Sequence, residues 1–473
     1  MTAASDVVEL HELSVAEAGA LVRTGRLTSL ELTENAVDRI ARLDPLLHSF
    51  VLVTADLARS RAEQADRELA AGHDRGPMHG IPYALKDIFA TAGIPTTSNS
   101  RLMVDHRPEQ DSAVEERLRD GGGVLLGKLA THEFALGGPS FELPFPPARN
   151  PWDLDRFPGA SSSGSGAAVA AGLVRVAIGS DTSGSIRGPA CHCGVVGLKP
   201  TFGLVSRRGA FPLSYSLDHV GPVARTVHDA ALALQVIGGP DDRDPAGAGV
   251  DPGDVTSPLD AGVAYLRIAY GRDMIAGDPA TSPEVLAAID GAVEILRGLG
   301  ARVEEVTLPP FELFNAVGRV IMAAEGYTIH ERWLRDRPAD YGRYTYQRLV
   351  PGAGLTAADL VQAQRVRRQL ADTMSRDVLT DHCALILGSS LAPAARFADF
   401  PRDWPPPRAA TATQTIVANV TGHPALGVPV GLSREGLPLG LQLIGRAFDE
   451  ATVLRIGAAL ERCLTPTLRP PGY

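Results

Sequence analysis

Cysteine and aromatic residues are scarce in this chain. Its 473 residues include 4 cysteines and 3 tryptophans, and aromatic side chains make up 5% of the total. Four cysteines in so long a chain are too few for a disulfide framework, so the sequence favours a reducing compartment. Charged residues make up 21% and hydrophobic residues 44%. This balance excludes an intrinsically disordered chain and allows a large globular core.

Long apolar runs are also missing. The longest, residues 166–179, is too short to span a bilayer and contains Arg175. The first twenty residues lack the basic and apolar regions of a secretory signal, so we expect a cytoplasmic protein that does not bind membranes. The net charge of −10 gives no general reason to expect a nucleic-acid partner. The sequence leaves the oligomeric state open between a monomer and a homodimer.

Several common catalytic and metal-binding motifs are absent or incomplete. The serine-rich region lacks the G-x-S-x-G elbow, and His132 lacks the second histidine of an H-E-x-x-H helix. Residues 122–129 nearly match a phosphate-binding loop, but Leu129 stands where Ser or Thr would bind magnesium. We interpret that segment as the edge of a strand. Cys191 and Cys193 lack partner ligands at metal-site spacing, so we expect buried, unreactive thiols and no metal site.

Helix and strand patterns alternate along most of the chain, which predicts an α/β fold. Ser14 with Glu17, and Thr28 with Glu31, fit capping boxes that open apolar-periodic segments. Steps from helix to strand are expected in residues 113–127, 163–181 and 283–307. Residues 238–259 are rich in Pro, Gly and Asp, and fit either a linker between domains or a surface loop of one domain.

Two serine- and glycine-rich stretches, 158–166 and 180–188, are joined by a small-residue helix and a strand. Each alone would be interpreted as a flexible loop, but the buried-looking segments between them favour an ordered arrangement. Ordered hydroxyls beside glycines suit acyl transfer, because glycine lets successive backbone N–H groups face a developing oxyanion. The pattern therefore raises the hypothesis of a serine nucleophile.

No histidine lies beside either serine run in the sequence, so a general base must come from elsewhere. Lys86, in the apolar segment "YALKDIF", is the natural candidate. Burial would have to lower its pKa from about 10.4 for the amine to be neutral near pH 7. Taken alone, Lys86 would instead be interpreted as a surface residue paired with Asp87.

Several long motifs taken together resemble the amidase signature family. They lie in residues 84–100, 130–138, 150–173, 178–209, 217–227 and 419–445. The resemblance covers roughly residues 8–465. It implies the amidase signature fold, which is α/β, with a large mixed, twisted sheet covered by helices on both faces. It also implies a single domain over residues 1–473, with an N-terminal helical segment at about 8–70, a signature core at about 80–230 and a substrate-loop and helical region at about 310–400.

The resemblance implies a Ser-cisSer-Lys triad. The family's nucleophile falls on Ser185, and its bridging serine, whose peptide bond to the preceding residue is cis, falls on Ser161. The base falls on Lys86. The family needs no metal or organic cofactor, so none is expected.

The backbone around the nucleophile has a role of its own in the family. The resemblance assigns the oxyanion hole to the backbone N–H groups of Thr182, Ser183, Gly184 and Ser185. Asp181 and Arg187 fit a structural ion pair better than a catalytic role. Ala160 and Ser183 stand where many members have glycine, and they would narrow the pocket without removing the triad.

Specificity in the family is determined by variable loops, here residues 130–148, 211–219, 314–334 and 388–397. These segments are rich in Phe, Leu, Met, Ala and Tyr, which favours a mainly apolar pocket for a hydrophobic or aryl amide, although core packing would select the same residues. The candidate substrate-binding residues are Leu136, Gly137, Gly138, Phe211, Tyr215 and Met322.

Four functions remain open. The first is an amidase for small, hydrophobic or aryl amides, and the second is a carbamate hydrolase (urethanase) that uses the same acyl-enzyme; in both, the partner is a small-molecule amide or carbamate. The third, ranked lower, is the A subunit of a tRNA-dependent amidotransferase. The fourth is a biuret or allophanate hydrolase, which would need a polar, arginine-lined pocket that the variable loops do not clearly offer.

Overall fold

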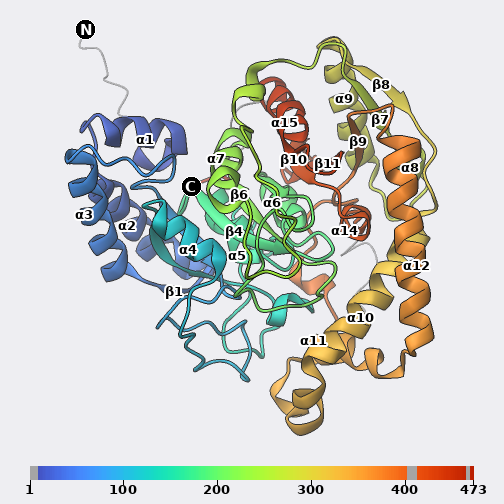
Figure 1. Cartoon of the computed structure of the whole chain (residues 1–473), viewed down its shortest axis with the longest axis horizontal. Coiled ribbons are helices and arrows are strands. Elements are labelled where there is room, and N and C mark those ends of the chain that lie inside the picture. The colour runs from blue at the N-terminus through green and yellow to red at the C-terminus, as the bar shows by residue number, and fades with distance from the viewer. Residues whose placement is uncertain (1–8, 402–412, 465–468) are drawn as a thin grey trace.

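Eleven strands form one mixed sheet in the computed structural model, which describes residues 9–401, 413–464 and 469–473 (Figure 1). The strand order is β1-β3-β2-β4-β6-β5-β10-β11-β9-β7-β8. The strands are β1 (Phe50–Val53), β2 (Pro82–Lys86), β3 (Val124–Leu129), β4 (Val176–Asp181), β5 (Val196–Lys199), β6 (His219–Ala224), β7 (Arg267–Tyr270), β8 (Arg302–Glu305), β9 (Ala384–Gly388), β10 (Ala425–Leu432) and β11 (Pro438–Gly445). The pairs β3–β2–β4 and β9–β7–β8 are parallel and the other pairs are antiparallel.

Helices cover both faces of this sheet. They are α1 (Val15–Arg23), α2 (Ser29–Leu47), α3 (Ala55–Ala70), α4 (Ala113–Asp120), α5 (Ser163–Ala170), α6 (Arg187–Cys193), α7 (Val227–Ile237), α8 (Arg272–Ala276), α9 (Pro283–Gly298), α10 (Phe311–Asp336), α11 (Arg343–Leu349), α12 (Ala357–Thr373), α14 (Ile416–Thr421) and α15 (Glu450–Leu464). Short helical turns are η1 (Leu10–Glu12), η2 (Glu133–Ala135), η3 (Ser257–Asp260), η4 (Pro338–Asp340), η5 (Val350–Gly354), η6 (Met374–Val378) and η7 (Phe397–Asp399).

The alternation of side chains in β2 shows how the two faces are filled. Tyr83 and Leu85 belong to a core with α1, α7, α9 and α15, whereas Ala84 belongs to a second core with α2, α3 and α5. The expected mixed α/β sheet covered on both faces is therefore confirmed.

Local sequence signals set several element boundaries as expected. Both capping boxes form, at the start of α1 and of α2. The three predicted steps from helix to strand are α4 to β3, α5 to β4 and α9 to β8. The segment that nearly matches a phosphate-binding loop is strand β3, in which buried Lys128 donates a 2.6 Å hydrogen bond to the carbonyl of Phe89.

Of the predicted loop, residues 238–259, positions 239–256 contain no helix or strand, whereas Gly238 forms a β-bridge with Val205 and residues 257–259 begin η3. Strands from both sides of this loop join the same sheet, since β1–β6 precede it and β7–β11 follow it. The single-domain division over residues 1–473 stays a prediction.

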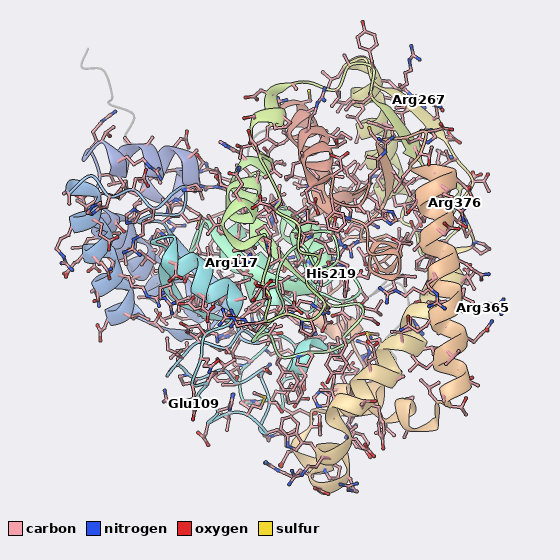
Figure 2. The ribbon with its side chains drawn as sticks, in the orientation of Figure 1. Glu109, Arg117, His219, Arg267, Arg365 and Arg376 are labelled. Atoms are coloured by element: carbon pink, nitrogen blue, oxygen red, sulfur yellow. The ribbon has the colours of Figure 1, made fainter. Side chains whose placement is uncertain are left out.

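Helices α10 and α12 pack against each other along one edge of the molecule (right in Figure 1), and α11 lies near their lower end. Figure 2 shows Arg365, on α12, and Arg376, just after it, at that outer edge, whereas His219 at the start of β6 lies in the middle of the molecule. Across the described ranges, no helix is long and apolar enough to cross a membrane.

Candidate active site

The predicted catalytic segments meet at one edge of the sheet. Parallel neighbours β2 and β4 end at Lys86 and Asp181, so the two residues lie at the same edge. Strand β6 runs antiparallel to β4 and pairs His219 with Asp181, which places the residues just before β6 at that edge too.

Lys86 is fully buried, and its Nζ donates hydrogen bonds to Ser161 Oγ at 2.7 Å and to Ser180 Oγ at 2.9 Å. Burial lowers the pKa of Lys86 to about 7, against the opposing effect of the nearby carboxylates of Asp218 and Asp181. A large fraction of this amine is therefore neutral at neutral pH and able to accept a proton. The alternative of a surface residue paired with Asp87 is wrong.

Ser161 and Ser185 line the same cavity, next to Lys86. The peptide bond between Ala160 and Ser161 is cis. Ser161 lies just before helix α5, and its carbonyl accepts a 3.1 Å hydrogen bond from the amide of His132. Residues Ser161 and Ser185 are 2% and 9% exposed. The structure thus brings together the three residues of the predicted triad.

A buried ion pair between Arg187 and Asp181 anchors the loop that carries Ser185. Arg187 is fully buried, and its Nε and Nη2 donate to the carboxylate of Asp181 at 3.0 and 2.9 Å. Burial alone would raise the pKa of Asp181, but the charge of Arg187 and the hydrogen bonds from Arg187 and Asn419 hold it well below its usual range. The predicted structural ion pair is confirmed.

Gly184 departs from its predicted role. Its amide N–H donates to Asp181 Oδ1 at 2.7 Å, so it is already engaged and not open to an oxyanion. The φ of Gly184 is +123°, and a Cβ there would lie 2.1 Å from Thr415 Oγ1. That hydroxyl donates a 2.6 Å hydrogen bond to the carbonyl of Ser183 and fixes the loop. The oxyanion roles of the amides of Thr182, Ser183 and Ser185 stay predictions.

A cavity of about 440 Å³ opens in front of Ser185. All four predicted variable segments contribute to its wall, and Ala160 and Ser183 line it as expected. Of the candidate substrate-binding residues, it is lined by Leu136, Gly137, Gly138 and Met322. Its other apolar walls include Phe157, Leu213, Phe311, Phe400 and Ile416.

Phe211 and Tyr215 were expected in this wall, and the structure places them elsewhere. Both border a second cavity of about 240 Å³. The ring of Phe211 packs against Phe134 and Trp333, with centroids 4.8 and 6.2 Å apart, so it belongs to an aromatic cluster. Tyr215 is 54% exposed. Leu213, between them in the sequence, lines the first cavity.

The charged and polar part of the first cavity was not predicted from the sequence. Arg319, Arg348, Asn315 and Asp278 line it, so the expectation of a mainly apolar pocket is only partly right. Arg319 Nε donates to Asn315 Oδ1 at 3.1 Å. Burial and the nearby charge of Arg319 lower the pKa of Arg348 to about 10. The positions of Asn315, Arg319 and Met322 follow helical spacing along α10, a signal that could have placed Arg319 on the cavity face.

Cys191 and Cys193 are buried, free thiols, as expected. Burial raises the pKa of Cys191 to about 11 and that of Cys193 still further, so neither thiol is a nucleophile near neutral pH. Among the residues whose positions are described, no group of three or more His, Cys, Asp or Glu side chains could hold a metal ion.

Known proteins resemble this chain over nearly its whole length. The sequence model of the family described as Amidase matches residues 31–454. The A subunit of a glutamyl-tRNA(Gln) amidotransferase from Anaeromyxobacter sp. (strain K) is 39% identical over 487 residues, covering 98% of each chain.

Two solved structures also match closely. A chain from a vestigial protein complex, described as revealing the origins of an s-triazine catabolic enzyme, has a TM-score of 0.90 and 34% identity, covering 97% of this chain and 100% of its own. A bacterial aryl acylamidase of the amidase signature enzymes has a TM-score of 0.87 and 29% identity, covering 96% of both chains.

Proposed function

Because this chain belongs to the amidase signature family, we propose that it hydrolyses the C–N bond of small linear amides through an acyl-enzyme on Ser185. The observation that carries the proposal is the 2.7 Å hydrogen bond from buried Lys86 to Ser161. Ser161 lines the same cavity as Ser185. A lysine with a pKa near 7 in that position is a suitable general base.

The reaction proceeds in two steps. In the first, Ser185 Oγ attacks the carbonyl carbon while its proton passes to Ser161 and the proton of Ser161 passes to Lys86. The relay then returns a proton to the leaving nitrogen, and the C–N bond breaks to leave an ester on Ser185. In the second step, water attacks that ester, gives a proton to the same relay, and releases the carboxylic acid and free Ser185. A carbamate follows the same route, with an amine, an alcohol and carbon dioxide as products.

The test is turnover by the purified chain of a matched aryl acetamide and aryl carbamate, with glutamine assayed in parallel. The Ser185→Ala variant should lose at least about 1000-fold in rate, since it removes the nucleophile. An unchanged rate in that variant would overturn the proposal. The ratio of amide to carbamate turnover decides between amidase and urethanase.

The two cavity arginines favour a substrate that also carries a carboxylate or another anionic group. Arg319 comes from α10 and Arg348 from α11, and both reach the cavity that holds Ser185. Arginine pairs bind carboxylates through charge-assisted hydrogen bonds.

Substitution of Arg319 by Met should raise KM for a carboxylate-bearing amide about 10-fold and leave KM for its neutral isostere unchanged. Equal changes for both substrates would rule this preference out. The two arginines in the cavity wall also support the biuret or allophanate alternative. The sequence of the variable loops alone did not clearly offer such an arginine-lined pocket.

The name of the Anaeromyxobacter relative favours a second candidate function, that of an amidotransferase subunit. Such a role would require partner subunits and glutamine as the nitrogen donor. Turnover of glutamine with no turnover of aryl amides or carbamates would favour this candidate over the first.

A further inference from the structure

Asp218 belongs to the segment "SLDHVGP", and the proposed reaction gives it no role. Its Oδ1 accepts a 2.6 Å hydrogen bond from Thr182 Oγ1. Its Oδ2 accepts hydrogen bonds from the amides of Leu213 at 2.8 Å and Ser214 at 3.0 Å. Within the described part of the chain, the hydrogen-bond partners of this carboxylate are therefore all neutral.

The fold brings Asp218 to the same edge of the sheet as Lys86. Asp218 immediately precedes β6, whose first residue pairs with Asp181 at the end of β4. Ser180, which accepts the second hydrogen bond from Lys86, and Thr182 lie on either side of Asp181. Ser180, Thr182 and Asp218 together border the second cavity. Lys86 thus lies between Ser161 on the substrate cavity and Ser180 on the second cavity.

The proton relay needs a negative charge near this lysine. Each time Lys86 accepts a proton, a positive charge forms in a fully buried site, which is costly without a nearby anion. Asp181 is already paired with Arg187 and hydrogen-bonded to Asn419. Asp218 has no such ion pair among the described residues. Burial raises the pKa of its carboxyl group, whereas the hydrogen bonds from Thr182, Ser214 and Leu213 favour the anion that can interact with Lys86.

We propose that Asp218 is a positioning residue of the triad: its carboxylate stabilises the ammonium form of Lys86 during the proton relay and anchors Thr182 beside the nucleophile loop. The inference rests on the proposed function of Ser185 and Lys86. The charged or titratable groups that face Lys86 are Asp181, Asp218 and His132. Arg207 faces Asp218.

His132 does not compete with Asp218 for this role. Burial lowers the pKa of His132 to about 4, so the ring is neutral over the range in which Lys86 titrates. Arg207 donates to the carbonyl of Tyr215 and lies 3.8 Å from the carboxylate of Asp244. Its charge is therefore shared with another acid on the wall of the second cavity.

The test measures the rate at which phenylmethylsulfonyl fluoride modifies Ser185 as a function of pH, followed by mass spectrometry. Ser185 Oγ attacks sulfur, fluoride leaves, and the serine proton passes through Ser161 to Lys86. This reaction needs the triad but no amide substrate. The midpoint of the acid limb should lie near 7 for the wild type. In Asp218→Asn it should move down by about one pH unit, because the ammonium form loses its neighbouring anion.

Two control variants separate charge from structure. Asp244→Asn removes a carboxylate from the wall of the same cavity, where it accepts from the amide of Arg207 at 2.8 Å, and should leave the midpoint unchanged. Thr182→Val removes the hydroxyl but keeps the charge of Asp218, so it should lower the plateau rate without moving the midpoint. Asp218→Ala replaces Asp218→Asn if the latter does not fold, because water from the cavity can take the place of the carboxyl group.

The outcomes decide between the two proposals. A midpoint that stays within about 0.2 pH units of wild type in a folded Asp218 variant would overturn the role of Asp218 alone, since loss of a neighbouring anion must move the pKa of the lysine. Equal shifts in the Asp218 and Asp244 variants would also overturn it, because the effect would then be general. If the wild type is modified no faster than Ser185→Ala at any pH, the assignment of Ser185 is wrong and the role of Asp218 is rejected with it.

Discussion

Burial lowers the pKa of Lys86, as its proposed role as a base requires, and also has a cost in stability. The side chain is fully buried among hydroxyl groups, and its pKa lies near 7 in place of 10.5. A lowered lysine pKa means that the unfolded chain binds the proton more tightly than the folded chain does. The destabilising effect is complete below pH 7 and disappears as pH rises above 10.5. The proposed function of Lys86 and the stability of the fold therefore make opposite demands on this residue.

Lys86→Met should abolish turnover and increase stability by about 2 kcal/mol at pH 7, because the buried amine is replaced by an apolar side chain of similar length. The gain should shrink between pH 7 and 10.5, where the unfolded wild-type lysine loses its proton. Urea unfolding of both proteins at several pH values measures this difference. A gain that stays constant with pH would contradict the lowered pKa, and wild-type turnover near neutral pH would contradict the base assignment.

Single residues also show where sequence-based prediction succeeds and where it ends. Lys86, Ser161 and Ser185 could be placed because each lies in a short motif whose order along the chain is distinctive. Arg348 could not, because α11 reaches the cavity only through the packing of distant helices. Phe211 and Leu213 differ by two positions and are both apolar, and both border the second cavity, yet only Leu213 also reaches the first cavity. The engagement of the Gly184 amide depends on a carboxylate orientation that no sequence pattern encodes.

At the scale of elements, contacts from two directions constrain the loop between β4 and α6. The Asp181 carboxylate accepts a hydrogen bond from the amide of Gly184 within the loop. Thr415, just before α14, donates a hydrogen bond to the carbonyl of Ser183 in the same loop. The positive φ of Gly184 and its contact with Thr415 leave no room for a side chain. The loop geometry thus depends on an element that is distant in sequence.

Gly184→Ala should lower the free energy of unfolding by about 1–3 kcal/mol and reduce kcat, because the loop must shift away from Thr415. Gly188→Ala is the matched control, since a Cβ there would be 3.7 Å from the carbonyl of Ala160, an ordinary contact. Thermal unfolding of both variants tests the difference in stability. Turnover of Gly184→Ala is compared with wild type, because Gly188 itself lines the cavity. Equal stability of the two variants would argue against a strained loop.

A second link between elements involves Glu133 in η2. Its carboxylate accepts hydrogen bonds from Ser100 Oγ at 2.7 Å and from the amide of Gly342 at 2.8 Å, next to α11. Burial raises the pKa of Glu133 to about 6. The stability that this residue contributes is greatest below pH 4.5 and declines as pH rises through 6.

Glu133→Gln should therefore unfold with a different pH dependence from wild type. The variant stays neutral, so its stability relative to wild type should increase by about 2 kcal/mol between about pH 4 and 7. Parallel stability curves over that range would show that Glu133 is not protonated near pH 6. Chemical unfolding monitored by fluorescence provides both curves.

At the scale of the whole molecule, the fold class was predictable and the assembly of the cavity was not. Alternating helix and strand patterns indicate a mixed α/β sheet, and the family resemblance supplies its extent. The cavity, by contrast, combines residues from Asp278 to Ile416 with the signature core, and only tertiary packing brings them together.

The chemistry proposed for the whole enzyme uses only side chains and water. Turnover should therefore be unchanged after extensive dialysis against EDTA, measured with the aryl acetamide and the aryl carbamate. Loss of activity that returns on addition of a divalent metal would contradict a serine-lysine mechanism. The same preparation, assayed before dialysis, is the control.

The order of strands in the sheet has a consequence for synthesis of the protein. Strands β10 and β11, formed by residues 425–445, lie between β5 and β9 and thus join the two halves of the sheet. Arg187 also donates hydrogen bonds to Gln442 and to Asn419, so part of the support for the Ser185 loop comes from residues 255 and 232 positions later in the sequence. A nascent chain that has not yet emerged beyond residue 445 lacks these contacts, and its central strands keep an unpaired edge. The sheet around Ser185 can therefore be completed only after residue 445 has been synthesised.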